Sequence, residues 1–134
     1  MVASRDIPNI ITGIGNAEVE QIKQILTFIN NHYNDNINLE RVAKMAYMNP
    51  YYFSVYFKKI TGMNFKDYVT QVRLKQATEI LNKQDLKTYE LAEMIGFTDA
   101  RYFNELFKKK YGLSPSRYRQ ELDESKKQLE GENL

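Results

Sequence analysis

The sequence of 134 residues predicts an all-α protein of seven helices, in which two helix-turn-helix subdomains are joined by one long helix. Three observations predict this class. Apolar residues recur at alternating spacings of three and four, which is the period of a helix with one buried face. Asparagine, proline and glycine stand where helices begin and end. Finally, the stretch YFSVYFKKITG at 52–62 returns fifty residues later as YFNELFKKKYG at 102–112.

The first helix follows residues 1–17, which have no helical period and which we interpret as a linker or the remnant of an upstream region. Its apolar stripe consists of Val19, Ile22, Leu26, Ile29 and Tyr33. A dimerising coiled-coil seam would need three or four heptads, so we interpret this stripe as a contact with the domain's own core. The Asn-rich stretch 31–38 ends the helix, and Asn38 caps a short helix at 39–46.

The next start signal is Asn49 followed by Pro50, an N-cap and a proline at the first helical position, where its missing N–H costs nothing. This helix, at about 50–61, ends at Gly62. Asn64 can cap the longest helix, at 65–83. The expected buried positions of that helix are Val69, Val72, Ala77, Ile80 and Leu81.

The second half of the chain repeats this order. A short helix at 88–95 is broken by Gly96, and Thr98 or Asp99 caps a helix at about 99–110 that ends before Gly112. Ser114 and Pro115 begin a last helix that continues into a charged tail, which we expect to fray. The expected segments are a linker at 1–17, a first helix-turn-helix subdomain at 18–62, a connecting helix at 63–83, a second subdomain at 84–122 and a flexible tail at 123–134.

Both copies of the repeat place a short helix before a longer one, across a turn of a few residues. Phe53 and Phe57 lie four residues apart on one helical face, as do Phe103 and Phe107, so both pairs should be buried. In a helix-turn-helix, the second helix can enter a DNA major groove about 12 Å wide. A helical protein-interaction module without DNA affinity would show the same buried aromatics and surface lysines. The pattern alone therefore leaves both functions open.

Charge distinguishes the middle of the chain from its ends. Residues 37–119 hold fifteen Lys and Arg against eight Asp and Glu, whereas 1–36 and 120–134 are mildly acidic. A basic middle favours a polyanionic partner, although a solvated lysine-rich surface would give the same surplus.

The composition argues against several other classes. No apolar run reaches the roughly 18 residues needed to cross a membrane, and the start is a poor signal peptide. With no cysteine there is no disulfide framework, which fits a reducing cytoplasm. His32 is the only histidine and has no cysteine to share a metal with. Because no phosphate-binding glycine loop, nucleophile motif or metal-ligand cluster is present, we expect no enzyme, no cofactor and no bound metal.

Residues 95–119, IGFTDARYFNELFKKKYGLSPSRYR, resemble the AraC/XylS family of bacterial transcription regulators. The matching elements are Ile95-Gly96-Phe97, Asp99, Tyr102-Phe103, Phe107-Lys108-Lys109, Gly112, Ser114-Pro115 and Tyr118-Arg119. The resemblance continues through 73–81 and back to about residue 20. It implies a homeodomain-like fold, in which the helices at about 50–61 and 99–110 enter successive major grooves of double-stranded DNA.

The resemblance also implies partners and a setting. The chain would be a cytoplasmic, nucleoid-associated regulator bound to a promoter or operator, with RNA polymerase as a second candidate partner. Many members of the family carry a sensory or phosphoryl-receiver domain ahead of this module, so we expect the DNA-binding part of a larger regulator. The isolated module should be monomeric, and an upstream domain could dimerise it.

The family's base-contacting positions fall on outward residues near the start of each recognition helix. They are Tyr51, Ser54 and Val55 in the first unit, and Ala100, Arg101, Asn104 and Glu105 in the second. Arg101 can bind a guanine edge and Asn104 an adenine edge. Glu105 can accept from a cytosine amine, or pair with Arg101 instead. We therefore expect more hydrogen-bonded base readout from the second unit than from the first.

Basic residues beyond these positions are candidates for phosphate contacts, which supply affinity and salt dependence more than specificity. They are Lys58, Lys59, Lys108, Lys109 and Arg119. Arg73, on the connecting helix, is expected to be structural.

One position departs from the repeat, because Tyr47 stands where the second turn has Gly96. A tyrosine at positive φ is strained. We therefore expect the first turn to be built differently from the second.

Overall fold

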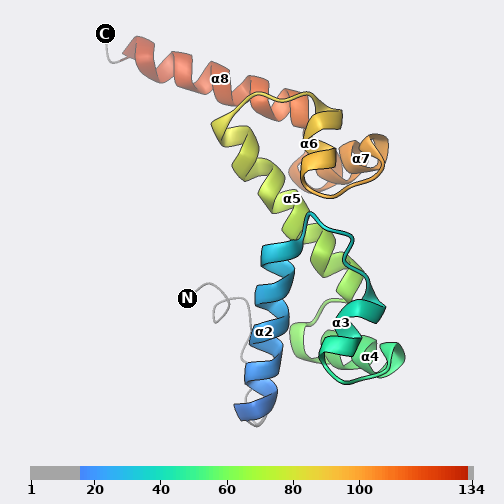
Figure 1. Cartoon of the computed structure of the whole chain (residues 1–134). Coiled ribbons are helices and arrows are strands. Elements are labelled where there is room, and N and C mark those ends of the chain that lie inside the picture. Colours follow the sequence, from blue (N-terminus) through green and yellow to red (C-terminus); the bar gives the residue numbers. More distant parts are fainter. Residues whose placement is uncertain (1–15, 133–134) are drawn as a thin grey trace. The chain divides into compact units, whose positions relative to one another are not determined.

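The computed structural model describes residues 16–132, and within that range it contains seven helices and no strand (Figure 1). The helices are α2 (Asn16–His32), α3 (Leu39–Met45), α4 (Pro50–Thr61), α5 (Phe65–Lys83), α6 (Thr88–Met94), α7 (Ala100–Tyr111) and α8 (Pro115–Glu132). The predicted all-α class is therefore confirmed. The chain forms two compact units, which divide between Val72 and Arg73 inside α5. None of the described helices is both long and apolar enough to span a membrane.

The helix ends follow the cap residues that the sequence predicts. Asparagine side chains accept hydrogen bonds from the first turns of α3, α4 and α5, at Asn38, Asn49 and Asn64. Of the two candidates for α7, Asp99 is the cap, and its Oδ1 accepts from the N–H groups of Arg101 and Tyr102. Gly62 and Gly112 end α4 and α7 in the left-handed conformation that glycine adopts without strain.

The core of the first unit contains one face of α2. Its buried side chains are Ile22, Ile25, Leu26 and Ile29, which belong to the same cluster as Phe53 and Phe57 of α4. Val19 and Tyr33, at the two ends of the predicted stripe, are only half-buried. The stripe therefore packs into its own domain, as interpreted from the sequence.

The second unit has a matching core. The α5 residues Leu74, Ala77 and Leu81 are buried at the same spacing as Ile22, Ile25 and Ile29 of α2. Of the expected core residues of α5, Ile80 is only half-buried, and Val72 is half-buried against the core of the first unit. Aromatic contacts are repeated as well, because the rings of Phe107 and Tyr118 lie 5.5 Å apart, as do those of Phe57 and Tyr68. Each unit is thus a three-helix core closed by the start of a fourth helix.

The two ends of the chain were expected to be irregular. Of the predicted linker at 1–17, residues 1–15 lie outside the described range, and the last two residues begin α2. At the other end, 123–132 are helical rather than a flexible tail. Pairs of side chains four residues apart support this extension of α8. They are Arg117 with Glu121, Arg119 with Asp123, and Gln120 with Glu124.

Candidate nucleic-acid interface

The turn of the first unit is fixed by backbone hydrogen bonds. The N–H of Tyr47 donates to the carbonyl of Lys44 at 3.1 Å, and the N–H of Met48 donates to the carbonyl of Ala43 at 3.0 Å. Ala43 is fully buried, and its small side chain lets α3 approach α4 closely. Asn49 then caps α4. These contacts determine the direction in which α4 leaves the turn.

The turn of the second unit has the same hydrogen bonds. The N–H of Gly96 donates to the carbonyl of Glu93 at 3.2 Å, and the N–H of Phe97 donates to the carbonyl of Ala92 at 2.9 Å. Each bond matches one in the first turn at an offset of 49 residues, whereas α7 begins fifty residues after α4. Thr98 is therefore the inserted residue, and it lies between the turn and the cap of α7.

Tyr47 has the backbone conformation that was expected only of Gly96. Its φ is 57°, in the left-handed region, and the φ of Gly96 is 98°. The expectation that the first turn is built differently is therefore wrong. The strain of about 1–2 kcal/mol is tolerated because the hydrogen bonds on either side determine the turn. The side chain itself meets no clash, since it is 96% exposed.

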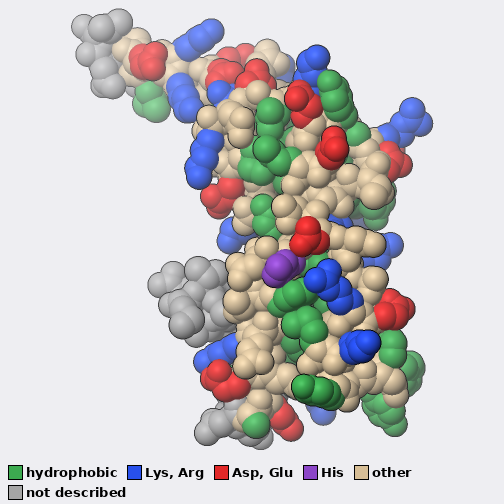
Figure 2. Space-filling view, in the orientation of Figure 1, with side chains coloured by type: hydrophobic (Ala, Val, Ile, Leu, Met, Phe, Trp, Pro, Cys, Tyr) green, Lys and Arg blue, Asp and Glu red, His purple; other side chains and the backbone are tan. Residues whose placement is uncertain are grey.

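The outward stripe of α4 consists of Tyr51, Ser54, Val55, Lys58 and Lys59. Tyr51 and Val55 each stand two residues before a buried phenylalanine, which places them about 160° around the helix from it. Their side chains are 76% and 53% exposed, and Ser54 beside them is half-buried. The stripe is aromatic and apolar at the start of the helix, and basic in its last turn. Figure 2 shows hydrophobic side chains at the surface over α4.

The outward stripe of α7 consists of Ala100, Arg101, Asn104, Glu105, Lys108 and Lys109. Arg101 and Glu105 are exposed, whereas Ala100 and Asn104 are half-buried. Among the described residues, no ion pair joins Arg101 to Glu105, so the alternative contact considered from the sequence is not formed. Both charged groups are directed to solvent, where they could meet the polar edges of a ligand.

Arg119 lies apart from these stripes. Its guanidinium donates to the carbonyl of Leu81, in the last turn of α5, and forms an ion pair with Asp123 at 3.1 Å. The side chain is 16% exposed. Arg119 thus satisfies a carbonyl that would otherwise lack a partner at the helix end. The predicted phosphate contact at this residue stays a prediction, and it would compete with these two internal contacts.

A polar residue of the first helix supports the turn of each unit. Gln21 of α2 donates to the carbonyl of Ala46 at 3.2 Å, and accepts from the hydroxyl of Tyr56 at 3.4 Å. Arg73 of α5 places its guanidinium 5.7 Å from the ring centre of Phe97, and partial burial lowers its pKa. Arg73 is therefore structural, as expected. The structural role of Gln21 was not predicted from the sequence. Aligning the two cores could have indicated it, because Gln21 directly precedes the buried Ile22 as Arg73 directly precedes the buried Leu74.

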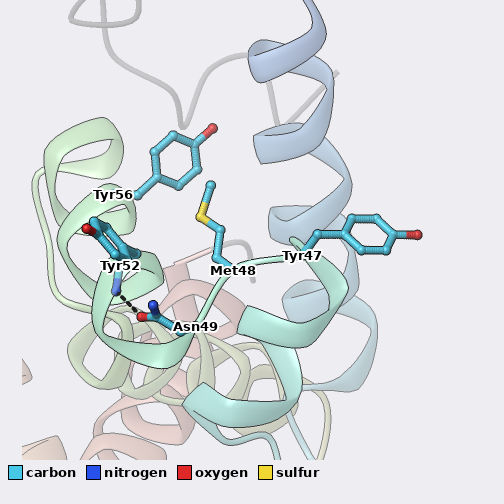
Figure 3. Close-up of a pocket in the computed structure, with 5 residues that line it drawn as sticks. All are labelled: Tyr47, Met48, Asn49, Tyr52 and Tyr56. Atoms are coloured by element: carbon cyan, nitrogen blue, oxygen red, sulfur yellow. Dashed lines mark hydrogen bonds between the residues drawn. The ribbon is translucent and has the colours of Figure 1, made fainter.

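An open hollow of about 430 Å³ lies beside the start of α4 and is lined by Tyr47, Met48, Asn49, Tyr52 and Tyr56 (Figure 3). Figure 3 shows Met48, Tyr52 and Tyr56 around it, with the Tyr47 ring directed away from them. Burial, and then the charge of Glu18, raise the pKa of Tyr56. The hollow brings together aromatic rings without a charged group, so it offers packing rather than acid–base chemistry.

The face of the molecule that Figure 2 shows is not uniformly basic. On the surface visible in Figure 2, Lys and Arg are mixed with Asp and Glu in both units.

The described residues include no group of three His, Cys, Asp or Glu that could hold a metal ion. His32, at the end of α2, instead lies 3.2 Å from Asp35 and stacks on Phe28. The outward stripes of α4 and α7 lie on equivalent helices of the two units, and each follows the same turn.

Comparison with known proteins gives a consistent result. A family model described as a helix-turn-helix domain matches residues 42–121. The regulatory protein PocR of Salmonella typhimurium is 36% identical over 105 residues, which cover 78% of this chain and 35% of PocR. The bifunctional transcriptional activator and DNA repair enzyme AdaA of Bacillus subtilis is 34% identical over 101 residues, which cover 75% of this chain and 48% of AdaA. The chain spans about a third of the length of its first curated relatives, most of which are named as regulators.

Solved structures are similar over most of the chain. The C-terminal domain of the two-component response regulator yesN from Fusobacterium nucleatum has a TM-score of 0.70 and 36% identity, and the match covers 78% of this chain and 99% of that domain. The DNA-binding domain of AdpA, solved in complex with a target DNA, has a TM-score of 0.69 and 26% identity, covering 72% and 87%. The residues that the family model matches, 42–121, include both turns and both outward stripes. The chain therefore belongs to the AraC-type family of helix-turn-helix transcription regulators.

Proposed function

We propose that this chain binds double-stranded DNA sequence-specifically as the DNA-binding part of a larger bacterial transcription regulator, with α4 and α7 as its two recognition helices. The observation that carries the proposal is the repeated turn. Both turns have the same backbone hydrogen bonds, and each directs a capped helix with an outward stripe that ends in lysines. The family, and the DNA complex of its relative AdpA, support the assignment.

The base contacts are assigned to the first half of each outward stripe. On α7, the exposed guanidinium of Arg101 suits a guanine edge, Asn104 an adenine edge and Glu105 a cytosine amine. Ala100 offers only a methyl group. On α4, the corresponding contacts come from Tyr51, Ser54 and Val55. Hydrogen-bonded readout is thus assigned mainly to the second unit.

The phosphate contacts are assigned to four exposed lysines in the last turns of the recognition helices, Lys58, Lys59, Lys108 and Lys109. Each phosphate neutralised on B-DNA adds about 0.9 to the slope of log affinity against log salt. Four contacts would weaken binding roughly a hundredfold between about 50 mM and about 200 mM salt. Arg119 is left out of this set because its guanidinium is engaged by Leu81 and Asp123.

The remaining features of the regulator are also proposals. The coverage of only about a third of PocR supports a further domain in the intact protein, of a sensory or receiver type, which could dimerise it. The isolated domain is assigned as a monomer, with RNA polymerase as a second partner and the nucleoid of the cytoplasm as its location. We assign no enzymatic activity, because the match covers only 48% of AdaA and most relatives are named as regulators.

Selection of bound sites from a random DNA pool, followed by affinity measurements at increasing salt, tests the proposal. We expect one preferred sequence and a steep salt slope. Replacing the four lysines with glutamine should lower that slope by about 3 to 4. The matched control replaces Lys126 and Lys127, exposed on α8, and should leave the slope nearly unchanged. Absence of both a preferred site and a salt slope would instead favour a helical protein-interaction module.

A further inference from the structure

The start of the α4 stripe carries apolar groups where the start of the α7 stripe carries charged ones. Tyr51 and Val55 correspond to Arg101 and Glu105 at the offset of fifty residues. All four are exposed on the face opposite the buried phenylalanines. The difference therefore lies in the chemistry of the two surfaces and not in the way the helices are held.

Val55 is the most informative of these residues. Its side chain is 53% exposed, has no hydrogen-bonding group, and is β-branched, which lowers helix propensity. A single exposed apolar residue needs no explanation. Here, however, Val55 lies one turn from Tyr51, whose ring centre lies 6.0 Å from that of Tyr52, so three exposed side chains with apolar groups are neighbours at the start of α4.

The occupant of this surface must satisfy two conditions. The same stripe continues into Lys58 and Lys59, so the occupant should carry an apolar group next to negative charge. In the major groove, the C5-methyl group of thymine is the apolar feature of the base edges, and phosphates flank it on both strands. A hydrophobic protein partner would match the apolar half of the stripe alone.

We infer that the outward stripe of α4 recognises thymine by its methyl group, so that the first unit selects a thymine-containing half-site through apolar contact with Val55 and Tyr51. This inference rests on the proposed function and names the feature of DNA that α4 selects. Removing one buried methyl group should weaken binding about fourfold.

Deoxyuridine substitution measures this contact directly, because it removes the methyl group and keeps the base-pairing and hydrogen-bonding edges of thymine. With the full chain of 134 residues and its selected site, each thymine in turn is replaced by deoxyuridine, and the dissociation constant is measured at one salt concentration. We expect about fourfold weaker binding at one or two clustered positions.

Variants assign the effect to α4. In Val55→Ala the penalty at those positions should largely disappear, whereas Glu105→Ala, at the matching position of α7, should retain it in full. Both residues are exposed, and far-UV circular dichroism verifies that the variants fold.

The outcomes separate the two proposals. If no thymine-to-deoxyuridine change weakens binding to a preferred site, or if the penalty persists in both Val55→Ala and Tyr51→Ala, the methyl contact is wrong and DNA binding itself stands. An unchanged DNA affinity in Val55→Ala would likewise overturn the inference and indicate that the stripe faces a protein. If no preferred site exists, the proposed function fails, and this inference fails with it.

Discussion

Val69 and Arg119 occupy the same place in two units whose cores are otherwise alike. Both follow directly after a tyrosine, Tyr68 or Tyr118, whose ring lies 5.5 Å from a buried phenylalanine ring. In the first unit, Val69 is buried in the same cluster as Ile29. In the second, Arg119 binds the carbonyl of Leu81, the residue of α5 that corresponds to Ile29. The start of the fourth helix of each unit is thus held against the first helix by apolar packing in the first unit and by a charged hydrogen bond in the second. We call this contact the closing corner of the unit.

This difference shows which parts of a repeated fold can vary. The buried phenylalanines and the turn hydrogen bonds are retained in both copies, since they direct each recognition helix. The closing corner varies, because valine packs against apolar side chains there and arginine donates a hydrogen bond to a backbone carbonyl. The outward stripes vary most, and the functional information of each unit should lie in them.

The largest effect is expected for the shared core. Phe57→Ala and Phe107→Ala should each lower the free energy of unfolding of their own unit by about 3 to 5 kcal/mol, because each removes a fully buried ring. Urea denaturation followed by circular dichroism measures both. Costs that differ by more than about 2 kcal/mol would contradict the equivalence of the two cores.

Base discrimination is the second comparison. Arg101→Ala should lose about 1 to 3 kcal/mol of preference at one G·C pair, since a bidentate contact is removed. Ser54→Ala, at the half-buried position of α4, should lose less. Competition binding with single-base variants of the selected site measures both losses. The control Arg101→Lys keeps the charge and should still lose selectivity, because lysine lacks the planar fork.

A larger loss of selectivity in Ser54→Ala than in Arg101→Ala would contradict the assignment of hydrogen-bonded readout to the second unit. Equal losses would also count against it.

The closing corner of the second unit gives the third test. Arg119→Met should lower the free energy of unfolding by about 1.5 kcal/mol, because it removes a charged hydrogen bond to the carbonyl of Leu81. Arg117→Met on the same helix is the control, since its ion pair with Glu121 is exposed and should contribute about 0.5 kcal/mol or less. Urea denaturation of both variants measures the difference.

DNA binding by the same variant tests the sequence-based interpretation of Arg119. If Arg119 is structural, Arg119→Met should leave the salt slope unchanged. A slope lower by about 1 would restore Arg119 as a phosphate contact.

The features that were predictable from the sequence are local ones. Asn49 with Pro50, Asp99, and the glycines that end α4 and α7 act through neighbours within a few residues, so their roles can be inferred from spacing. The role of Arg119 could not be inferred, because its partner Leu81 is 38 residues away. The last helix was predicted to continue past residue 123 only as a fraying tail, since charge alone does not distinguish a helix supported by ion pairs from a frayed one.

The candidate base contacts were predictable only as positions. Their outward orientation follows from the buried phenylalanines, and the structure places Tyr51, Val55, Arg101 and Glu105 on exposed faces accordingly. Which bases they contact depends on a DNA surface that the fold does not contain, so this part stays a prediction.

The smallest expected effect concerns the two turns, where the steric argument from sequence failed. Tyr47 is held at a φ of 57° with its ring exposed, so replacing it removes strain and little packing. Tyr47→Gly should raise the free energy of unfolding by about 1 kcal/mol. Glycine loses more conformational freedom on folding, which offsets part of the gain. Tyr47→Asn avoids that loss, because asparagine tolerates the left-handed region, and it should be at least as stable.

The reciprocal Gly96→Ala should lower stability by about 1 kcal/mol. Urea midpoints of the three variants measure the balance. If both Tyr47 variants are less stable than the parent chain, the ring makes a stabilising contact, and the two turns are less alike than their hydrogen bonds indicate.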